Sequence, residues 1–254
     1  MDHVDAIGPV LVVVPTYNER DNIGPLLTKL LAMTPAVDVL VVDDASPDGT
    51  GEIADALAAS DERAHVLHRE RKSGLGAAYV AGFRWGLARG YAALVEMDAD
   101  GSHDPGDLPR LLDALREHDV VLGSRYVPGG NVLNWPGHRR LLSRGGNVYS
   151  RMALGVRIND ITSGFRAYRR EVLDALPLDE IASQGYCFQI DLAWRSVTAG
   201  YSVAEVPITF VERETGNSKM SGAIVREAML NVGVWGLRHR ATQLRGLLAR
   251  AVRR

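Results

Sequence analysis

Two apolar runs rich in β-branched residues constrain the fold of this chain most. The first extends from Val10 to Val14 and stops at Pro15, and the second extends from Val37 to Val42 with Asp38 as its one polar residue. Such runs are typical of strands that are covered on both faces of a parallel sheet. Four leucines between residues 26 and 31 are spaced as on one face of a helix. This part of the sequence therefore predicts a strand–helix–strand unit.

The alternation continues along the chain. We expect helices around Ile53 to Leu57 and over residues 79–87, 108–115 and 187–197, and strands over residues 64–67, 92–97, 120–122, 203–206 and 208–211. Strands alternating with helices predict a mostly parallel α/β sheet whose ligand-binding loops gather at one edge. Residues 128–137 and 160–166 are predicted to be loops, and residues 138–144, which mix cations with leucines, favour an exposed helix face.

The charged residues are distributed unevenly along the chain. The chain has 254 residues, of which 46% are hydrophobic, and this is enough for one large α/β domain with an appendage. Residues 222–254 hold seven arginines and one acid, a formal charge of +6, which leaves −8 for the first 221 residues. We therefore predict a domain over residues 1–221 and a basic, amphipathic, helical segment over residues 222–254. Such a segment suits an anionic surface, either lipid or nucleic acid.

Other features exclude some classes of protein. The single Cys187 excludes an internal disulfide framework and a cysteine-rich zinc site. An acidic N-terminus and the lack of about 20 consecutive apolar residues predict neither a signal peptide nor a spanning helix. The histidines at positions 68, 103 and 138 are interpreted as surface or structural residues.

Asp98 and Asp100 follow the apolar run that ends near Met97. Side chains in a strand repeat every two residues, so both carboxylates leave the strand end on one face. A hard cation with a polyphosphate would relieve their mutual repulsion. A helix cap is the alternative role, but Asp104 followed by Pro105 already has the pattern of an N-cap.

The segment from Lys72 to Ala78 contains Gly74 and Gly76, as a phosphate-binding glycine loop would. It lacks the third glycine of a dinucleotide fingerprint and does not directly follow a strong strand. We interpret these glycines as a tight helix start.

Six motifs in order carry a resemblance to a known family: residues 15–19 (PTYNE), 43–50 (DDASPDGT), 97–100 (MDAD), 123–126 (GSRY), 163–166 (SGFR) and 218–219 (SK). From about residue 10 to about residue 220, the sequence resembles the dolichol-phosphate (polyprenol-phosphate) mannose synthases. These are family 2 glycosyltransferases of GT-A (Rossmann-like) fold. The composition, rich in Ala, Arg and Gly, is most similar to the actinobacterial polyprenol monophosphomannose synthases.

The resemblance implies a set of site residues. A nucleotide-sugar pocket would be lined by Pro15, Tyr17, Glu19, Val42, Asp44 and Ala99. Mg²⁺ or Mn²⁺ would be held by Asp98 and Asp100, with Ser102 as a further ligand at a position where some relatives have glutamine. Donor phosphates would meet Arg213 and Lys219, and the acceptor phosphate would meet Arg125, Arg139, Arg144 and Ser163.

The activity implied is the transfer of mannose from GDP-mannose to a polyprenyl phosphate, with inversion. A phosphate monoester is largely dianionic at neutral pH, so no general base is expected. Three alternatives stay open. One is a glucosyltransferase that uses UDP-glucose, and another is a hydroxyl-acceptor transferase with Asp191 or Glu180 as base. The third is a non-catalytic nucleotide-binding membrane scaffold.

The resemblance also implies a location. A lipid phosphate lies at the headgroup level, so we expect a peripheral protein on the cytoplasmic face of the membrane. The C-terminal segment and residues 138–151 would contact anionic lipid, with a membrane-embedded partner protein adding to the attachment, and no nucleic acid is expected as a partner. Residues 213–219, small and polar between two cations, are predicted to close over the donor diphosphate.

Overall fold

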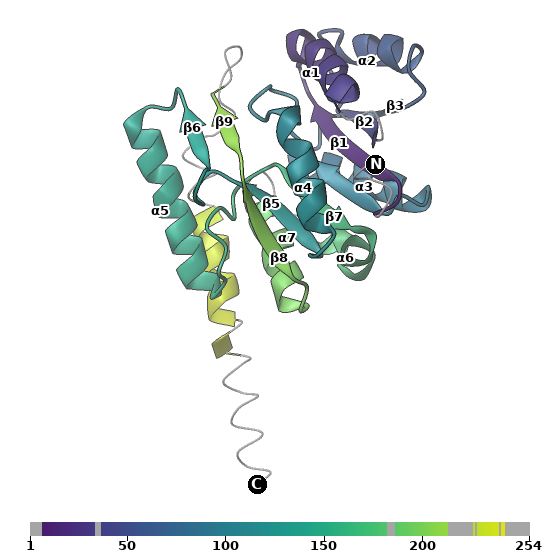
Figure 1. The fold of residues 1–254 in the computed structure, drawn as a ribbon. Helices are drawn as coiled ribbons and strands as arrows, with labels where there is room; N and C mark the ends of the chain where they lie inside the picture. Colours follow the sequence, from purple (N-terminus) through teal and green to yellow (C-terminus); the bar gives the residue numbers. More distant parts are fainter. Residues whose placement is uncertain are drawn as a thin grey trace.

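A seven-stranded sheet forms the centre of the protein (Figure 1). The computed structural model describes residues 7–33, 37–181, 186–212, 226, 228–238 and 240–241. The strand order is β3-β2-β1-β4-β7-β5-β8, and β7 alone runs antiparallel to its neighbours within this described sheet. The strands are β1 (Val10–Thr16), β2 (Val37–Asp43), β3 (Ala64–His68), β4 (Ala93–Glu96), β5 (Val120–Ser124), β7 (Arg166–Arg169) and β8 (Val203–Pro207). The predicted mostly parallel sheet is confirmed.

Helices cover both faces of this sheet (Figure 1). One face packs against α1 (Arg20–Met33), α2 (Thr50–Ala58) and α4 (Leu108–Leu115). A 3-10 turn over Pro105–Asp107 comes directly before α4. The other face packs against α3 (Leu75–Ala88), α5 (Gly137–Leu154), α6 (Arg170–Ala175) and α7 (Tyr186–Thr198). A second 3-10 turn spans Leu178–Glu180. The result is a three-layered α/β/α domain.

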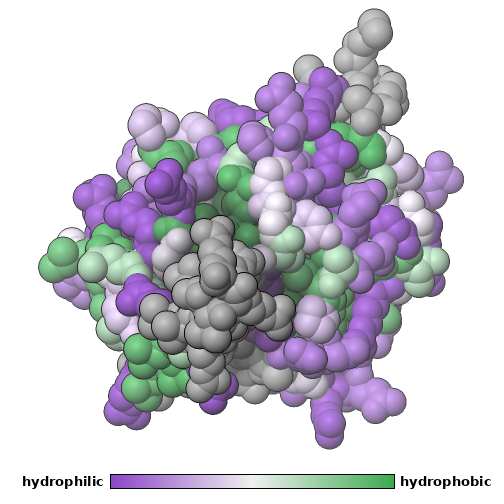
Figure 2. Space-filling view, turned by 90° about the horizontal axis from the view of Figure 1, so that it is seen from below, coloured by the Kyte–Doolittle hydropathy of each residue, from purple (hydrophilic) through white to green (hydrophobic). Residues whose placement is uncertain are grey.

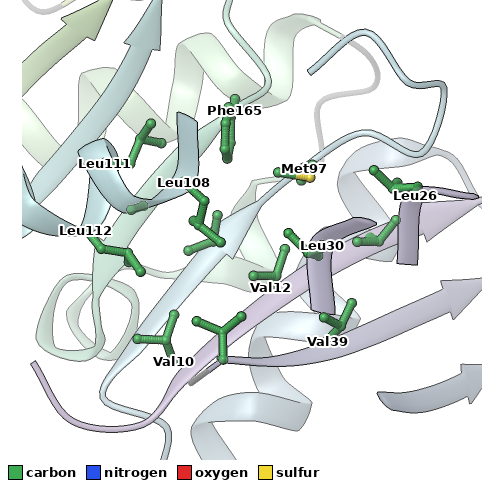
Figure 3. Packing of buried hydrophobic residues seen from close by; sticks show 14 of the residues in the cluster. Val10, Val12, Leu26, Leu30, Val39, Met97, Leu108, Leu111, Leu112 and Phe165 are labelled. Atoms are coloured by element: carbon green, nitrogen blue, oxygen red, sulfur yellow. The ribbon is translucent and has the colours of Figure 1, made fainter. Parts of the chain in front are cut away.

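Strand β1 shows why both runs are so rich in apolar residues. Val10, Val12 and Val14 belong to the core on the α1 face, whereas Leu11 and Val13 belong to the core on the α3 face. Figure 3 shows the first of these cores, in which residues of β1 and β2 meet leucines from α1 and α4. Because successive side chains of a strand point to opposite faces, a strand buried on both sides must be apolar at every position.

Helix α3 lies unusually close to the sheet because glycines face it. A Cβ atom added at Gly82 would lie 2.4 Å from Val13 Cγ1, and one at Gly86 would lie within 2.8 Å of Leu11 and Leu94. This close approach fixes the position of Tyr79, which is on the same helix and is fully buried.

The prediction of a loop over residues 160–166 is wrong at its end. Arg166 begins β7, which is inserted between β4 and β5, and α6 follows directly. Both elements went unpredicted because the strand is only four residues long and carries an arginine at each end. Arginine is rarely buried, yet Arg166 is fully enclosed in an interior strand.

The region after residue 125 is also more regular than the sequence indicated. The predicted loop over residues 128–137 contains β6 (Asn131–Leu133), which pairs in parallel with β9 (Thr209–Val211) to form a second, two-stranded sheet. The arginine- and leucine-rich residues 138–144 belong to α5, an 18-residue helix. The predicted strand pair around Pro207 is confirmed, but its second member lies in the small sheet.

The helical residues 228–238, here termed the C-terminal helical segment, lie alongside α5 (Figure 1). Tyr149 Oη donates to the carbonyl of Met229 at 2.9 Å, and Gly236 lies against the backbone of Ala153. Val232 is buried in the core on the α3 face. None of the described helices is both long and apolar enough to cross a bilayer. The predicted boundary at residue 221 lies outside the described residues and stays a prediction.

Candidate active site

The predicted site residues follow the carboxyl ends of neighbouring strands. Strands β2, β1 and β4 are adjacent in the sheet, and β5 lies beyond β7. Asp44 follows β2, Tyr17 follows β1, Asp98 follows β4 and Arg125 follows β5. Parallel strands end at the same edge, so the topology brings these residues to one side of the molecule.

Beyond β4, Asp98 and Asp100 are partly exposed whereas Met97 and Ala99 are buried. This alternation agrees with the prediction that both carboxylates emerge on one face. Tyr79 Oη donates to Asp98 Oδ1 at 3.0 Å. Burial, reinforced by the charge of Asp98, raises the pKa of Tyr79 well above its ordinary value, so the hydroxyl remains a donor.

Two further contacts shape the loop over residues 98–102, here termed the acidic loop. The backbone N–H of Ser102 donates to Asp100 Oδ1 at 3.1 Å, and Ser102 itself is buried. On the other side, Gly164 lies against Asp98, because a Cβ at Gly164 would be 2.9 Å from Asp98 Oδ2. Each carboxylate is thus oriented by a neighbouring hydrogen bond, and Asp98 is also confined by backbone.

The acidic loop fits a hard divalent cation. Carboxylate oxygens are the ligands that Mg²⁺ and Mn²⁺ prefer, and Mg²⁺ is commonly held by one or two carboxylates together with substrate phosphates. Among the described residues no group of three or more His, Cys, Asp or Glu side chains could form a closed cage. A cation here would therefore need ligands beyond these carboxylates, such as a hydroxyl, water or a bound phosphate.

Asp44 is the centre of a second cluster. Its carboxylate accepts hydrogen bonds from Arg69 at 2.5 Å and from the backbone N–H groups of Ser73 and Gly74 at 3.0 and 3.3 Å. Lys72 lies over the Tyr17 ring, with Nζ 3.8 Å from its centroid. The glycine-containing loop thus packs on the predicted nucleotide pocket, and its Lys72, together with Arg69, was missed as a candidate.

The turns after β1 and β2 hold their residues by local hydrogen bonds. Asn18 and Ala45 have positive φ angles of 58° and 56°, which residues other than glycine seldom adopt. Asp43 accepts from both Thr16 and Ser46, and the Glu19 carboxylate accepts from Asn22 at 2.8 Å. Such backbone geometry, held by side-chain bonds, is common at ligand sites. Pro15 and Val42 are buried beneath these turns.

Arg125 forms a buried ion pair with Asp160. Its Nε and one terminal nitrogen reach the two Asp160 oxygens at 2.7 and 2.6 Å, and its backbone N–H adds a third contact at 2.9 Å. Burial alone would raise the pKa of Asp160, but Arg125 outweighs it and holds the pKa below its ordinary value. This pairing could not be predicted from the sequence.

An apolar cavity opens beside this pair. It is lined by Arg125, Thr162, Trp135 and residues of α5, α7 and the C-terminal helical segment. Arg125 and Arg139 both face the Trp135 ring, with guanidinium carbons 5.5 and 4.5 Å from its centroid. Arg144 faces Tyr126 at 5.4 Å, as Arg125 also does. The predicted acceptor arginines therefore converge on two aromatic rings.

The small β6/β9 sheet joins the acidic loop to this cavity. The backbone N–H of Val211 donates to the carbonyl of Ser102 at 3.1 Å, and that of Glu212 donates to Leu133 at 3.2 Å. The Glu212 carboxylate pairs with Arg139 on α5. The end of β9 and the residue after it thus contact both the loop that carries the carboxylate pair and the wall of the cavity.

Comparison with protein families agrees with this geometry. The profile of Glycosyl transferase family 2 matches residues 11–176, which include β1 to α6 and both carboxylates. The chain belongs to this family. It is therefore a glycosyltransferase, and the sequence-based assignment is confirmed.

Two curated relatives of this glycosyltransferase are similar over nearly their whole length. The polyprenol monophosphomannose synthase of Mycolicibacterium smegmatis is 59% identical over 240 residues, which cover 94% of this chain and 91% of the relative. The undecaprenyl-phosphate mannosyltransferase of Micrococcus luteus is 57% identical over 241 residues, covering 95% and 98%.

Solved structures confirm the GT-A-like fold. Glucosyl-3-phosphoglycerate synthase from Mycobacterium tuberculosis, in complex with phosphoglyceric acid, superposes with a TM-score of 0.71 at 22% identity, over 91% of this chain and 82% of that one. A crystal structure of the same enzyme with Mn²⁺, UDP and glucosyl-3-phosphoglycerate gives a TM-score of 0.69 over 90% and 80% of the two chains.

Some predicted residues of the glycosyltransferase lie elsewhere. Ser163 is buried and does not line the cavity, and its hydroxyl accepts from the backbone N–H of Phe165 at 3.4 Å. The neighbouring Thr162 lines it instead. Arg213 and Lys219 lie outside the described residues, as does the segment between them, so their roles and its closure stay predictions.

The carboxylates considered as a general base are engaged with one arginine. Arg195 Nε donates to Asp191 at 2.8 Å, and another nitrogen of the same guanidinium reaches Glu180 at 3.5 Å. Burial raises the pKa of Asp191, with Arg195 opposing the shift. This arrangement favours a structural role for both acids over that of a base.

Two buried titratable groups support the acidic loop. His103 packs between the rings of Phe165 and Phe210, and burial lowers its pKa to about 4, so it is neutral at pH 7. The interpretation of His103 as structural agrees with this packing. Glu96 faces Arg166 across the β4–β7 pair, and burial raises its pKa to about 8 although Arg166 opposes the shift.

Gly164→Ala tests whether the backbone confines Asp98. The new Cβ would displace the carboxylate, so we expect kcat/KM for sugar transfer to fall about tenfold or more, equivalent to at least about 1.4 kcal/mol, and the apparent affinity for Mn²⁺ to weaken. The control is Gly24→Ala, where the added Cβ meets only Ile53 at 3.9 Å. Equal activity of the two variants would mean that Asp98 tolerates displacement.

Glu96→Gln tests whether the pKa of the buried Glu96 carboxyl is raised. The folded-state pKa of Glu96 is raised above that of the unfolded chain, so its stabilising contribution is present at low pH and is lost as the pH rises from about 4.5 to about 8. Between pH 6.5 and 8 the wild type should lose stability in urea titrations, and the smaller opposing contribution of His103, whose unfolded-state pKa is about 6.5, is shared by the variant. The variant should lose less. Parallel curves for the two proteins would contradict the raised pKa.

Proposed function

We propose that this glycosyltransferase transfers mannose from GDP-mannose to a polyprenyl phosphate, with inversion, to give a lipid-linked mannosyl donor. The observation that carries the proposal is a single edge of the sheet that combines two kinds of site. A pair of oriented carboxylates suited to a metal diphosphate lies on one side, and an apolar cavity walled by arginines lies on the other. The names of both curated relatives describe mannosyl transfer to a lipid phosphate or its product.

On the donor side, we assign the nucleotide to the pocket formed by Tyr17 and Asp44 with Pro15, Glu19 and Val42. Asp44 and Glu19 present carboxylates that can accept hydrogen bonds from a base or ribose. Lys72, which lies over Tyr17, adds a cation to this pocket. Arg213 and Lys219 are proposed to bind the diphosphate.

The cation proposed for the site is Mg²⁺ or Mn²⁺, held by Asp98 and Asp100, with Ser102 as a further ligand. When bound, it would neutralise charge on the diphosphate of the departing nucleotide. Tyr79 and Gly164 keep Asp98 in place for this role.

On the acceptor side, we assign the phosphate to Arg125, Arg139 and Arg144, and the first part of the polyprenyl chain to the apolar cavity. A phosphate monoester has a second pKa of about 6, so it reaches the site largely as a dianion. It attacks as the nucleophile without loss of a proton, which agrees with an acceptor pocket whose described charged groups are arginines and their paired acids. The chain's task is then to hold two anions in line.

We further propose that α5 and the C-terminal helical segment lie on the cytoplasmic face of an anionic membrane. Every large hydrophobic side chain that is exposed in the described residues lies on these two helices or on β6: Leu133, Leu141, Leu142, Val148, Met152, Met229, Leu230, Val234 and Leu237. Figure 2 shows hydrophobic residues mixed with hydrophilic ones at this end of the molecule, on the side where Figure 1 places α5. Apolar residues mixed with arginines are expected of an interfacial surface. A membrane-embedded partner protein would add to this attachment.

The transfer assay tests the activity. Radiolabel from GDP-mannose should appear in polyprenyl phosphate in a reaction that excess chelator abolishes, and Asp98→Asn or Asp100→Asn should lower kcat by about two orders of magnitude, a loss of a few kcal/mol. UDP-glucose serves as the competing donor. Transfer from UDP-glucose alone would move the enzyme to the glucosyltransferase alternative, and full activity in chelator would refute the metal assignment.

Liposome sedimentation tests the membrane face. The wild type should sediment with anionic vesicles at low salt and be released at high salt, since each arginine near the surface contributes about 1 kcal/mol. Leu141→Glu with Met152→Glu should abolish sedimentation, because both side chains are strongly exposed, at 74% and 68%. The control is the double variant Thr28→Glu with Ala56→Glu, which adds the same charge on α1 and α2 instead. If wild type and both double variants stay in solution, the membrane proposal fails and a partner must supply the docking.

A further inference from the structure

Two arginine–carboxylate pairs stand at the cavity, and they share one aromatic ring. Arg125 pairs with Asp160, and Arg139 pairs with Glu212. Both guanidinium groups face Trp135 and both line the cavity. Each positive charge is therefore already balanced by an acid within the described structure, so an incoming anion must compete with one of the two carboxylates.

The two carboxylates differ in how firmly they are held. Asp160 has no exposed surface and accepts from Arg125, Thr162 and Asn147. Its own N–H is bound by Glu205 at 2.9 Å. The Glu212 side chain is 26% exposed and, among the described residues, its carboxylate has Arg139 as its hydrogen-bond partner. Of the two acids, Glu212 is the one that can leave.

Arg139 carries an unused donor. Its Nε is buried and has no hydrogen-bond partner among the described residues. A buried N–H without a partner is costly, and in an arginine it is one prong of the fork that binds phosphate through two parallel bonds. Glu212 engages a terminal nitrogen of this guanidinium and leaves Nε unsatisfied. Because Nε shares an edge of the guanidinium with the other terminal nitrogen, Nη2, a phosphate bound at that edge would satisfy Nε.

We propose that Glu212 is a counter-ion of Arg139 that competes with the acceptor phosphate for this guanidinium. In the absence of acceptor it holds Arg139 over Trp135. The acceptor phosphate takes the Nε edge of the Arg139 fork and weakens the contact with Glu212, while the Arg125–Asp160 pair stays intact. This inference rests on the proposed function, because it concerns the same acceptor phosphate.

The competition affects every anionic headgroup. Glu212 lowers the affinity of Arg139 for a phosphodiester and for a phosphate monoester alike. The monoester keeps the advantage of its second negative charge and further acceptor oxygens. A polyprenyl phosphate is a monoester, whereas the anionic headgroups of bulk phospholipids such as phosphatidylglycerol are diesters. Glu212 thus raises the concentration at which either headgroup occupies Arg139.

The test compares Glu212→Gln with the wild type in neutral detergent micelles that contain polyprenyl phosphate and graded amounts of phosphatidylglycerol. Removing one charge of a partly exposed pair should lower the acceptor KM about fivefold, as expected for about 1 kcal/mol. The donor KM should not change. Phosphatidylglycerol should inhibit the variant at about a fifth of the concentration that inhibits the wild type. Glu52→Gln, on the exposed surface of α2, is the matched control.

A second set of variants separates this role from a structural one. Arg139→Gln should raise the acceptor KM, and adding Glu212→Gln to it should have no further effect, because the two residues act as a pair. Quenching of Trp135 fluorescence by polyprenyl phosphate, with Trp135→Phe as the blank, reports binding without turnover and should strengthen in Glu212→Gln. Glu212→Ala should behave as Glu212→Gln does.

The outcomes distinguish this inference from the proposed function. If the wild type transfers mannose but Glu212→Gln raises the acceptor KM, or leaves phosphatidylglycerol inhibition unchanged, Glu212 is only a structural partner of α5 and the inference is wrong. If the wild type transfers no sugar to polyprenyl phosphate in any mixture, the proposed function itself fails.

Discussion

The site depends on one buried guanidinium. Arg166 lies on the antiparallel strand β7, and it donates to the carbonyls of Ile161, Ser163 and Gln189 at 2.6 Å each. These bonds fasten the loop before β7 and helix α7 to the centre of the sheet. Glu96 lies opposite Arg166 on the adjacent strand β4, but its pKa of about 8 leaves it mostly protonated at neutral pH, so the three carbonyls provide most of the stabilisation of the buried charge. Without such partners an enclosed cation would be prohibitively costly. The loop that it fastens carries both Gly164, which confines Asp98, and Asp160, which holds Arg125.

The sequence predicted those features that a short stretch of chain determines. The runs at Val10 and Val37 could be assigned to interior strands because burial on both faces leaves few polar positions, of which the half-buried Asp38 is one. The spacing of Asp98 and Asp100 placed two carboxylates on one face because the strand period is two. Motif order identified the family, and these local signals were sufficient for the parallel part of the fold and for the acidic loop.

The features that were missed depend on contacts between distant residues. Arg125 and Asp160 are 35 positions apart, and no local pattern indicates that one arginine is paired while another faces solvent. Lys72 was assigned only to a helix start, although it lies on Tyr17 of another loop. Strand β7 was missed for a related reason. Its two arginines indicate an exposed segment, and only the partners supplied by α7 and β4 allow Arg166 to be interior.

Strand β7 also acts as a spacer. The carboxylates follow β4 and Arg125 follows β5, and β7 lies between these strands. Neighbouring strands are about 4.8 Å apart, so the two anchors leave the sheet about 10 Å from each other. Backbone hydrogen bonds on both sides of β7 set this distance, whereas a loop could shorten or lengthen it. Under the proposed function, a donor held beyond the first strand and a phosphate held beyond the second would therefore meet across a gap of fixed width. An insertion or deletion that changed the pairing of β7 would alter which pairs of substrates can react, even with every side chain of the site in place.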